Sequence, residues 1–122
     1  MDLVVECYRL CRLLPADERY LLSAQIRDAV VSVPTNIAEG HGRAGRGEYM
    51  NHLSMSRGSL MEVQTLLEIA RRVGYLGDKE LETAFGQWDS VSRMQTRLRK
   101  SLSRASPNSA RGAARRCPDA RR

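Results

Sequence analysis

The chain has 122 residues, a length typical of one small domain, and its formal net charge at pH 7 is +6. Apolar residues make up 42% and charged residues 28% of the sequence, which excludes wholesale disorder. No apolar run approaches the roughly 18 residues of a membrane span, and we expect neither a membrane segment nor a signal segment. The three cysteines do not form the paired pattern of a secreted disulfide scaffold, so we expect a cytoplasmic protein.

The positive charge is distributed unevenly along the chain. Residues 1–102 carry 14 Lys and Arg against 13 Asp and Glu, whereas residues 103–122 carry six Arg against Asp119. The basic character is therefore assigned to the C-terminal segment, and the overall charge gives no indication of a basic groove on the folded body.

The first two predicted elements are helices. Apolar residues at spacings of four, three and four predict a first helix from Leu3 to Leu14. Pro15 suits the first turn of a second helix, whose apolar face continues to Ile37. Within it, the β-branched segment 29–33 taken alone is typical of a strand, but nothing else in the chain alternates convincingly to pair with it. A helix bent at Pro34 is the favoured interpretation.

A loop and a third helix follow. Four glycines between positions 40 and 47 predict the loop. A helix is predicted from Glu48 to about Val73, because leucine recurs every seven residues with smaller side chains between. This heptad seam consists of Leu53, Ser56, Leu60, Val63, Leu67 and Ala70.

The last predicted helix begins near Asp78, which is expected to be its N-cap after Gly74 and Gly77 end the third helix. It is expected to run to residue 102. Residues 103–122 lack periodicity and predict a disordered Arg-rich tail. The fold class is therefore all-α, an antiparallel up-down four-helix bundle over residues 1–102 with a disordered C-terminal tail. Because the first helix is short, we expect an uncovered apolar strip that another subunit buries.

Few residues indicate catalysis. Residues 40–45 match G-x-G-x-x-G, but no strand precedes them and no parallel strand follows, so an interhelical turn is favoured over a dinucleotide site. His41 and His52 lack metal-ligand spacing, and a surface ion pair between Glu48 and His52 is expected. We therefore predict no catalytic residue, metal, cofactor or enzymatic activity.

Polar residues and a glycine inside the predicted helices have alternative interpretations. Asn36 is expected to satisfy the carbonyls that Pro34 leaves without a donor, and Glu39 is expected to pair with Arg43. A ligand site is the alternative for Asn36 and Glu39. Gly58 is expected either to permit a close helix approach or to produce a kink.

Residues 32–40 have the sequence Ser-Val-Pro-Thr-Asn-Ile-Ala-Glu-Gly. This run is the most specific of several segments by which the chain resembles the four-helix bundle family of 23S rRNA intervening-sequence proteins. We assign a structural role to the signature residues Pro34, Asn36, Glu39, Gly40 and Gly42. Matches elsewhere occur at residues 14–20, 25–27, 58–63, 66–67 and 74–76, and the resemblance covers about residues 3–102.

The resemblance implies an up-down bundle that assembles as a ring, typically a homopentamer, with no known catalytic residues. The chain is also similar, more distantly, to the basic pentameric accessory protein of diversity-generating retroelements, which is associated with nucleic acid. We therefore expect a non-enzymatic oligomer that acts as an RNA- or DNA-associated accessory or assembly protein. The alternative is a ring scaffold that binds an unknown protein partner and no nucleic acid.

Arginines are the expected nucleic-acid contacts. Two of them, Arg43 and Arg46, lie beside the glycine loop. The others belong to the predicted tail and supply most of the net charge. They are Arg104, Arg111, Arg115, Arg116, Arg121 and Arg122.

Overall fold

The computed structural model describes residues 1–18, 21–42 and 45–112, except for the side chains of Glu18 and of residues 104–112. This part of the chain is helical, as predicted. The elements in chain order are α1 (Asp2–Cys11), the short 3-10 helix η1 (Ala16–Glu18), α2 (Leu22–Gly42), α3 (Arg46–Arg72) and α4 (Asp78–Gly112).

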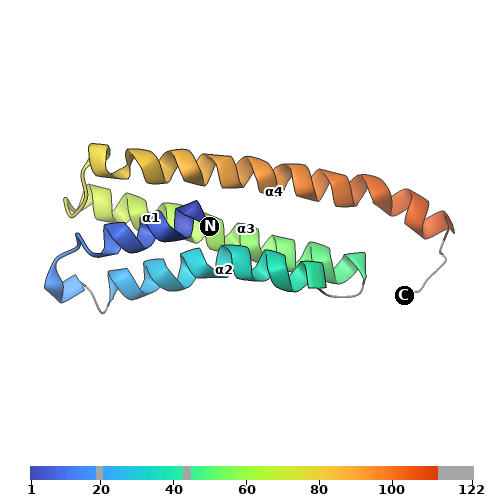
Figure 1. Ribbon diagram of the computed structural model, residues 1–122, viewed down its shortest axis with the longest axis horizontal. Helices are drawn as coiled ribbons and strands as arrows, with labels where there is room; N and C mark the ends of the chain where they lie inside the picture. Colours follow the sequence, from blue (N-terminus) through green and yellow to red (C-terminus); the bar gives the residue numbers. More distant parts are fainter. Residues whose placement is uncertain (19–20, 43–44, 113–122) are drawn as a thin grey trace.

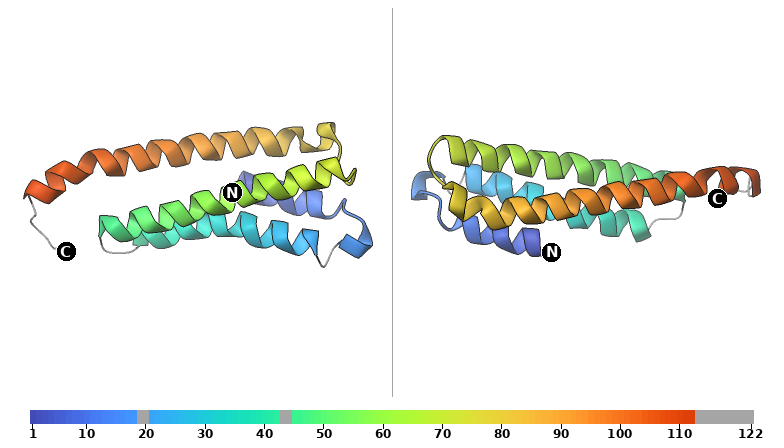
Figure 2. Two further views of the ribbon diagram at one scale, coloured as in Figure 1. Left: turned by 180° about the vertical axis from the view of Figure 1, so that it is seen from behind. Right: turned by 90° about the horizontal axis from the view of Figure 1, so that it is seen from above.

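Successive helices run in opposite directions along the long axis of the molecule, as Figure 1 shows. α2 packs on α3, α3 packs on α4, and α1 packs on both α2 and α4. Four helices therefore enclose the core at the end of the molecule that carries η1. The N-terminus lies near the middle of the longer helices in all three views (Figures 1 and 2). Beyond that point the described part of the bundle consists of α2, α3 and α4.

α1 contributes one stripe of core residues. Leu3, Cys7 and Leu10 recur at helical spacing and are 3% exposed or less. The helix ends at Cys11, earlier than predicted, because the next backbone N–H groups bond to carbonyls three residues back, including Leu14 N–H to the Cys11 carbonyl (3.3 Å). Leu14 is nevertheless buried, so the predicted stripe is correct and its last residue belongs to a turn.

α2 runs without interruption through Pro34, so the helical interpretation of residues 29–33 is confirmed. Ala29, Val30 and Val33 are buried on one face, whereas Val31 is exposed. The β-branched residues are therefore placed by the burial of this face against α1 and α3, which overrides their preference for strands.

α3 carries the predicted heptad seam, and every one of its six residues is buried. The helix begins after Gly45 and ends before Gly74, and both glycines have positive φ angles (97° and 88°). The Ala70 carbonyl accepts bonds from the N–H groups of Tyr75 (2.9 Å) and Leu76 (3.3 Å), which turns the chain toward α4.

α4 begins one residue earlier than predicted, because Gly77 and not Asp78 occupies the N-cap position. Asp78 is its first helical residue, and the Gly77 N–H donates to Glu80 Oε1 at 2.6 Å, as in half of a capping box. The helix continues to Gly112, ten residues beyond its expected end. Residues 103–112 of the predicted tail thus belong to α4, and residues 113–122 lie outside the described residues.

The short α1 leaves an apolar strip of its neighbours incompletely covered, as predicted. Val91 and Leu98 of α4 are only half-buried, and Met94 is 42% exposed. A cavity of about 60 Å³ lies at the start of α1, with Pro34 and Ile37 in its lining. The strip is therefore apolar surface that the described residues do not cover.

Candidate functional site

Buried hydrogen bonds connect α2, α3 and α4 through Ser56. Its hydroxyl donates to the Val33 carbonyl (2.8 Å) and accepts from Gln95 Nε2 (2.9 Å). Ser56 is fully buried and Gln95 is 2% exposed. Buried polar groups of this kind are costly unless they are paired, so these bonds favour a single alignment of the three helices.

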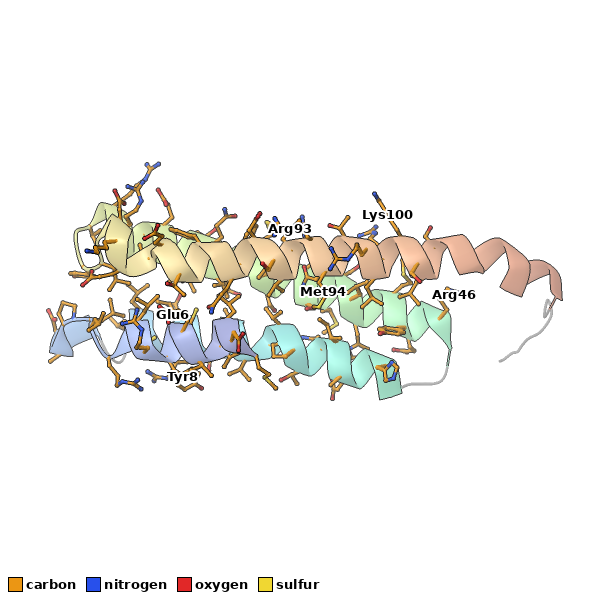
Figure 3. The ribbon with its side chains drawn as sticks, turned by 45° about the horizontal axis from the view of Figure 1, so that its top comes forward. Glu6, Tyr8, Arg46, Arg93, Met94 and Lys100 are labelled. Atoms are coloured by element: carbon orange, nitrogen blue, oxygen red, sulfur yellow. The ribbon has the colours of Figure 1, made fainter. Side chains whose placement is uncertain are left out.

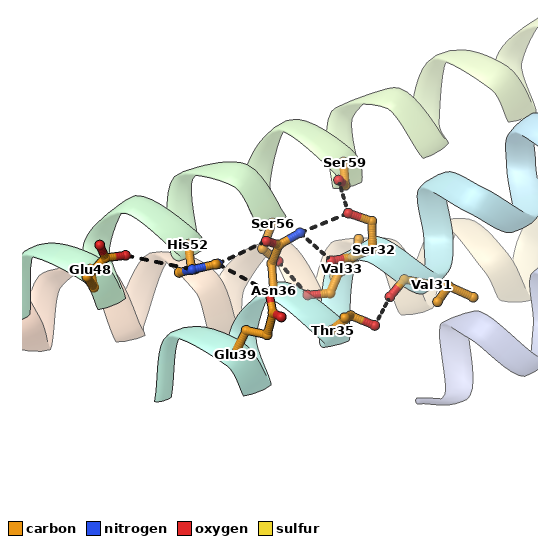
Figure 4. A network of polar contacts seen from close by, with 10 residues as sticks. All are labelled: Val31, Ser32, Val33, Thr35, Asn36, Glu39, Glu48, His52, Ser56 and Ser59. Carbon is orange, nitrogen blue, oxygen red and sulfur yellow. Dashed lines mark hydrogen bonds and ion pairs between the residues drawn. The ribbon is translucent and has the colours of Figure 1, made fainter. Parts of the chain in front are cut away.

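Asn36 extends the polar network along α2 (Figure 4). Its Nδ2 donates to the carbonyl and to the hydroxyl of Ser32, each at 2.9 Å, and Ser32 Oγ lies 2.7 Å from Ser59 Oγ. Asn36 Oδ1 is thus the acceptor that faces His52 Nδ1 at 3.1 Å, so Nδ1 is the donor. The signature residue Asn36 therefore joins α2 to α3.

Two carboxylates flank the buried ring of His52. Glu48 Oε1 lies 3.8 Å from Nε2, so the predicted i,i+4 pair is present, but His52 is 7% exposed and does not lie on the surface as expected. Glu39 Oε1 lies 3.8 Å from Nδ1. Both glutamates are more than half exposed. The predicted partner of Glu39, Arg43, lies outside the described residues. The contact of Glu39 with His52 was not foreseen, because it depends on the approach of two helices.

The prediction for Asn36 was wrong about its acceptor. Asn36 bonds to the Ser32 carbonyl four residues earlier. The carbonyl that Pro34 leaves without a backbone donor is that of Val30, four residues before the proline. The side chain of Asn36 thus connects helices rather than repairing the helix at the proline.

Gly40 marks the close approach of α2 to α3. A Cβ at this position would lie 2.8 Å from His52 Cβ and 3.1 Å from Tyr49 Cδ1. Gly58, the predicted candidate for close approach, has open space around it, and so does Gly42. The signature glycine at position 40 therefore has a packing role that position 42 does not share.

The charge is distributed unevenly along the chain, and the change from acidic to basic falls within α4. Residues 1–89 carry 10 basic and 13 acidic side chains, whereas residues 90–122 carry 10 basic side chains and one acidic side chain. From Ser90 to Gly112, α4 has no acidic residue. The helix dipole favours basic residues only in the last turn, whereas this stretch spans about 34 Å at 1.5 Å per residue. The dipole therefore does not account for the charge of the whole stretch. Figure 3 shows Arg93 and Lys100 on α4, with Arg46 at the start of α3.

A groove of about 350 Å³ lies between α3 and the basic half of α4. Its cationic side chains are Arg57, Arg99 and Lys100, and no carboxylate contributes to its lining. Arg57 Nη1 donates to Ser92 Oγ at 2.8 Å, which holds the guanidinium between the two helices. The groove is lined by Leu53, Arg57, Gln95, Thr96, Arg99, Lys100 and Ser103.

The structure describes few of the arginines that the sequence pointed to. Arg46 is half-buried in the first turn of α3 and makes a polar or electrostatic contact. The backbones of Arg104 and Arg111 belong to α4, but their side chains lie outside the description. Arg43, Arg115, Arg116, Arg121 and Arg122 lie outside the described residues altogether.

The sequence does contain a signal for the basic groove, namely the basic residues of α4, but summing the charge over residues 1–102 and 103–122 conceals it. A boundary at residue 103 joins the cationic residues of α4 to the acidic residues that precede them, and their charges cancel in the sum. A boundary after Asp89 separates the two groups. Arg57 has no such signal, because only folding brings it to Arg99.

The described part of the chain has neither a membrane-spanning helix nor a cluster of metal-binding side chains. No helix there is long and apolar enough to cross a membrane. No group of three or more His, Cys, Asp or Glu side chains is placed to hold a metal ion.

The helices and their connections define the class of protein, an up-down four-helix bundle with one short helix. The model of the 23S rRNA-intervening sequence protein family matches residues 1–97, and the chain belongs to this family. A crystal structure of a protein of unknown function from the S23 ribosomal protein family of Bacteroides thetaiotaomicron is similar, with a TM-score of 0.75 and 20% identity. The match covers 81% of this chain and 93% of that chain. No curated protein matches the chain significantly.

Proposed function

We propose that the protein is a non-enzymatic, cytoplasmic oligomer that associates with RNA or DNA as an accessory or assembly protein. The observation that carries the proposal is the acid-free basic half of α4, from Ser90 to Gly112. A stretch of chain with this positive charge attracts the phosphate backbone by releasing condensed counterions, whatever the base sequence. Four further arginines follow in residues 113–122 and add to the same charge.

The cations of this surface are available to an anionic ligand. Among the described residues, no carboxylate forms an ion pair with Arg57, Arg97, Arg99 or Lys100, whereas Arg93 is paired with Asp89. In α3, by contrast, Glu68 binds both Arg71 and Arg72. Phosphates would therefore meet unpaired cations in one half of α4 and neutralised ones at the opposite end of α3.

Self-association is the second part of the proposal, and we propose a homopentamer. The incompletely covered strip around Val91, Met94 and Leu98 supports burial by a second copy, as does the resemblance to ring-forming bundles. Light scattering on a size-exclusion peak is expected to give five times the 13.7 kDa mass of one chain. A monodisperse monomer at micromolar concentration would contradict the ring.

Binding to a labelled single-stranded RNA tests the nucleic-acid part of the proposal. Fluorescence anisotropy at 50 mM salt is expected to show binding by the full chain. A chain ended after Gly112 is expected to retain part of the affinity, because it keeps all of α4 while losing Arg115, Arg116, Arg121 and Arg122. If neither protein binds, the ring scaffold that binds a protein partner replaces this proposal.

A further inference from the structure

The groove between α3 and α4 differs from the rest of the basic surface because it combines cations with hydrogen-bonding groups. Arg57 and Arg99 reach it from separate helices, and Lys100 follows on α4. Thr96 and Ser103 contribute hydroxyl groups, and Leu53 contributes an apolar wall. A flat cationic surface would attract phosphate alone, whereas this lining also offers contacts to a sugar and a base.

Gln95 is an independent indication of a ligand. It lines the groove, is 2% exposed, and donates its Nε2 hydrogen to Ser56. Its Oε1 is buried and has no hydrogen-bond partner among the described residues. A buried acceptor without a donor is unfavourable, because it has lost its hydrogen bonds to water and gained none in the protein. A ligand that brings an N–H or O–H group to this oxygen would relieve that cost.

We propose that this groove binds an unpaired nucleic-acid strand, with phosphates on Arg57, Arg99 and Lys100 and a base or ribose donor near Gln95. The inference rests on the proposed function and specifies its substrate class. A groove of about 350 Å³ accommodates a base with its ribose from one strand, whereas the bases of a duplex are paired inside it and cannot enter the groove. Guanidinium groups also bind phosphate oxygens in pairs, which favours a phosphodiester over other anions.

A substitution that fills the groove with a larger side chain and leaves the charge unchanged tests the groove directly. Thr96 is exposed and lines the groove, so Thr96→Trp fills it and keeps every cation. Thr83→Trp makes the same change on an exposed face of α4, about 20 Å away by helical rise. Thr96→Trp is expected to weaken binding of a labelled single-stranded RNA at least about fivefold. Thr83→Trp is expected to leave it unchanged.

A second pair of variants keeps the test decisive if either tryptophan disturbs folding. Arg99→Gln and Arg97→Gln remove the same charge from neighbouring positions, but only Arg99 lines the groove. Arg99→Gln is expected to weaken single-strand binding about fivefold more than Arg97→Gln, the size of one charge-assisted hydrogen bond in water. Equal effects of the two variants would indicate a diffuse electrostatic surface and would overturn the inference.

Competitors distinguish the ligand class. Unlabelled single-stranded RNA is expected to displace the probe at a concentration at least tenfold lower than a duplex of the same length or polyglutamate. Equal displacement by duplex or by polyglutamate would refute an unpaired strand as the ligand. RNA binding that survives Thr96→Trp would refute the groove and leave the proposed function intact. An absence of RNA binding by the unmodified chain would instead refute the proposed function.

Discussion

Substitution of Gly40 by alanine tests whether the signature glycine holds α2 against α3. The new methyl group would lie 2.8 Å from His52 Cβ, an atom attached to the backbone of α3 that cannot rotate away. Overpacking of this kind costs roughly 1–3 kcal/mol, and the gain in helix propensity offsets up to about 1 kcal/mol of it. We expect Gly40→Ala to lower the free energy of unfolding by about 1 kcal/mol.

Gly58→Ala is the matched control. Gly58 is exposed within α3, and nothing lies within 4 Å of a Cβ there, so only the propensity gain operates. This variant is expected to raise the free energy of unfolding by roughly 0.5–1 kcal/mol. The two alanine variants should therefore differ by about 2 kcal/mol.

Urea denaturation followed by circular dichroism measures this difference. With a urea m-value of about 2 kcal/mol/M, the two midpoints should lie about 1 M apart, at one fixed protein concentration because the chain is expected to self-associate. If Gly40→Ala is as stable as Gly58→Ala, α2 does not need the close approach at His52. The structural role assigned to Gly40 would then be incorrect.

Three further properties follow from the described side chains. Ser56→Ala should lower the free energy of unfolding by roughly 1–3 kcal/mol in urea titrations, because it leaves Gln95 Nε2 buried without its acceptor and removes a hydrogen bond to the Val33 carbonyl. An unchanged midpoint would refute the role of the network. Hydrogen bonds from two neighbouring arginines lower the pKa of Glu68 from 4.5 to about 2. The stabilisation by the ionised Glu68 carboxylate is therefore complete above pH 4.5 and is lost as the pH falls toward 2. The urea midpoints of the unmodified chain and of Glu68→Gln should accordingly converge over that interval. A constant difference between the midpoints across this range would contradict the pairing. Burial raises the pKa of the Cys7 thiol to about 12, so mass spectrometry should find Cys7 unmodified after iodoacetamide treatment at pH 8 and alkylated once urea is added. Labelling without urea would show that the buried face of α1 is not held against the core.

Much of the fold could be predicted because local periodicity determines it. The heptad seam around Leu53, Leu60 and Leu67 predicts both a helix and its buried face, and the structure confirms both. The ends of elements were less predictable. Residues 103–112 are mostly Ser, Ala and Arg, which are compatible with a helix as well as a coil, and α4 continues to Gly112 although Pro107 disfavours a helix interior.

The candidate site was harder to predict because its contacts join residues far apart in sequence. Asn36 was recognised as a polar residue in an apolar helix, but its partner His52 lies 16 residues away on another helix. Arg57 and Arg99 are brought together only by the packing of α3 against α4. Sequence patterning describes one helix at a time, so it identifies the faces that pack without identifying the residues that meet.

The salt dependence of RNA binding tests the central claim that unpaired cations of α4 contact phosphates. For a single strand, the logarithm of the affinity falls by roughly 0.7 per contacted phosphate for each unit in the logarithm of the salt concentration. The double variant Arg99→Gln with Lys100→Gln should therefore reduce the slope by about 1.4 relative to the unmodified chain. The control Arg71→Gln with Arg72→Gln removes the same charge from side chains that are already paired with Glu68 and should leave the slope unchanged. Equal slopes for the two double variants would contradict the account.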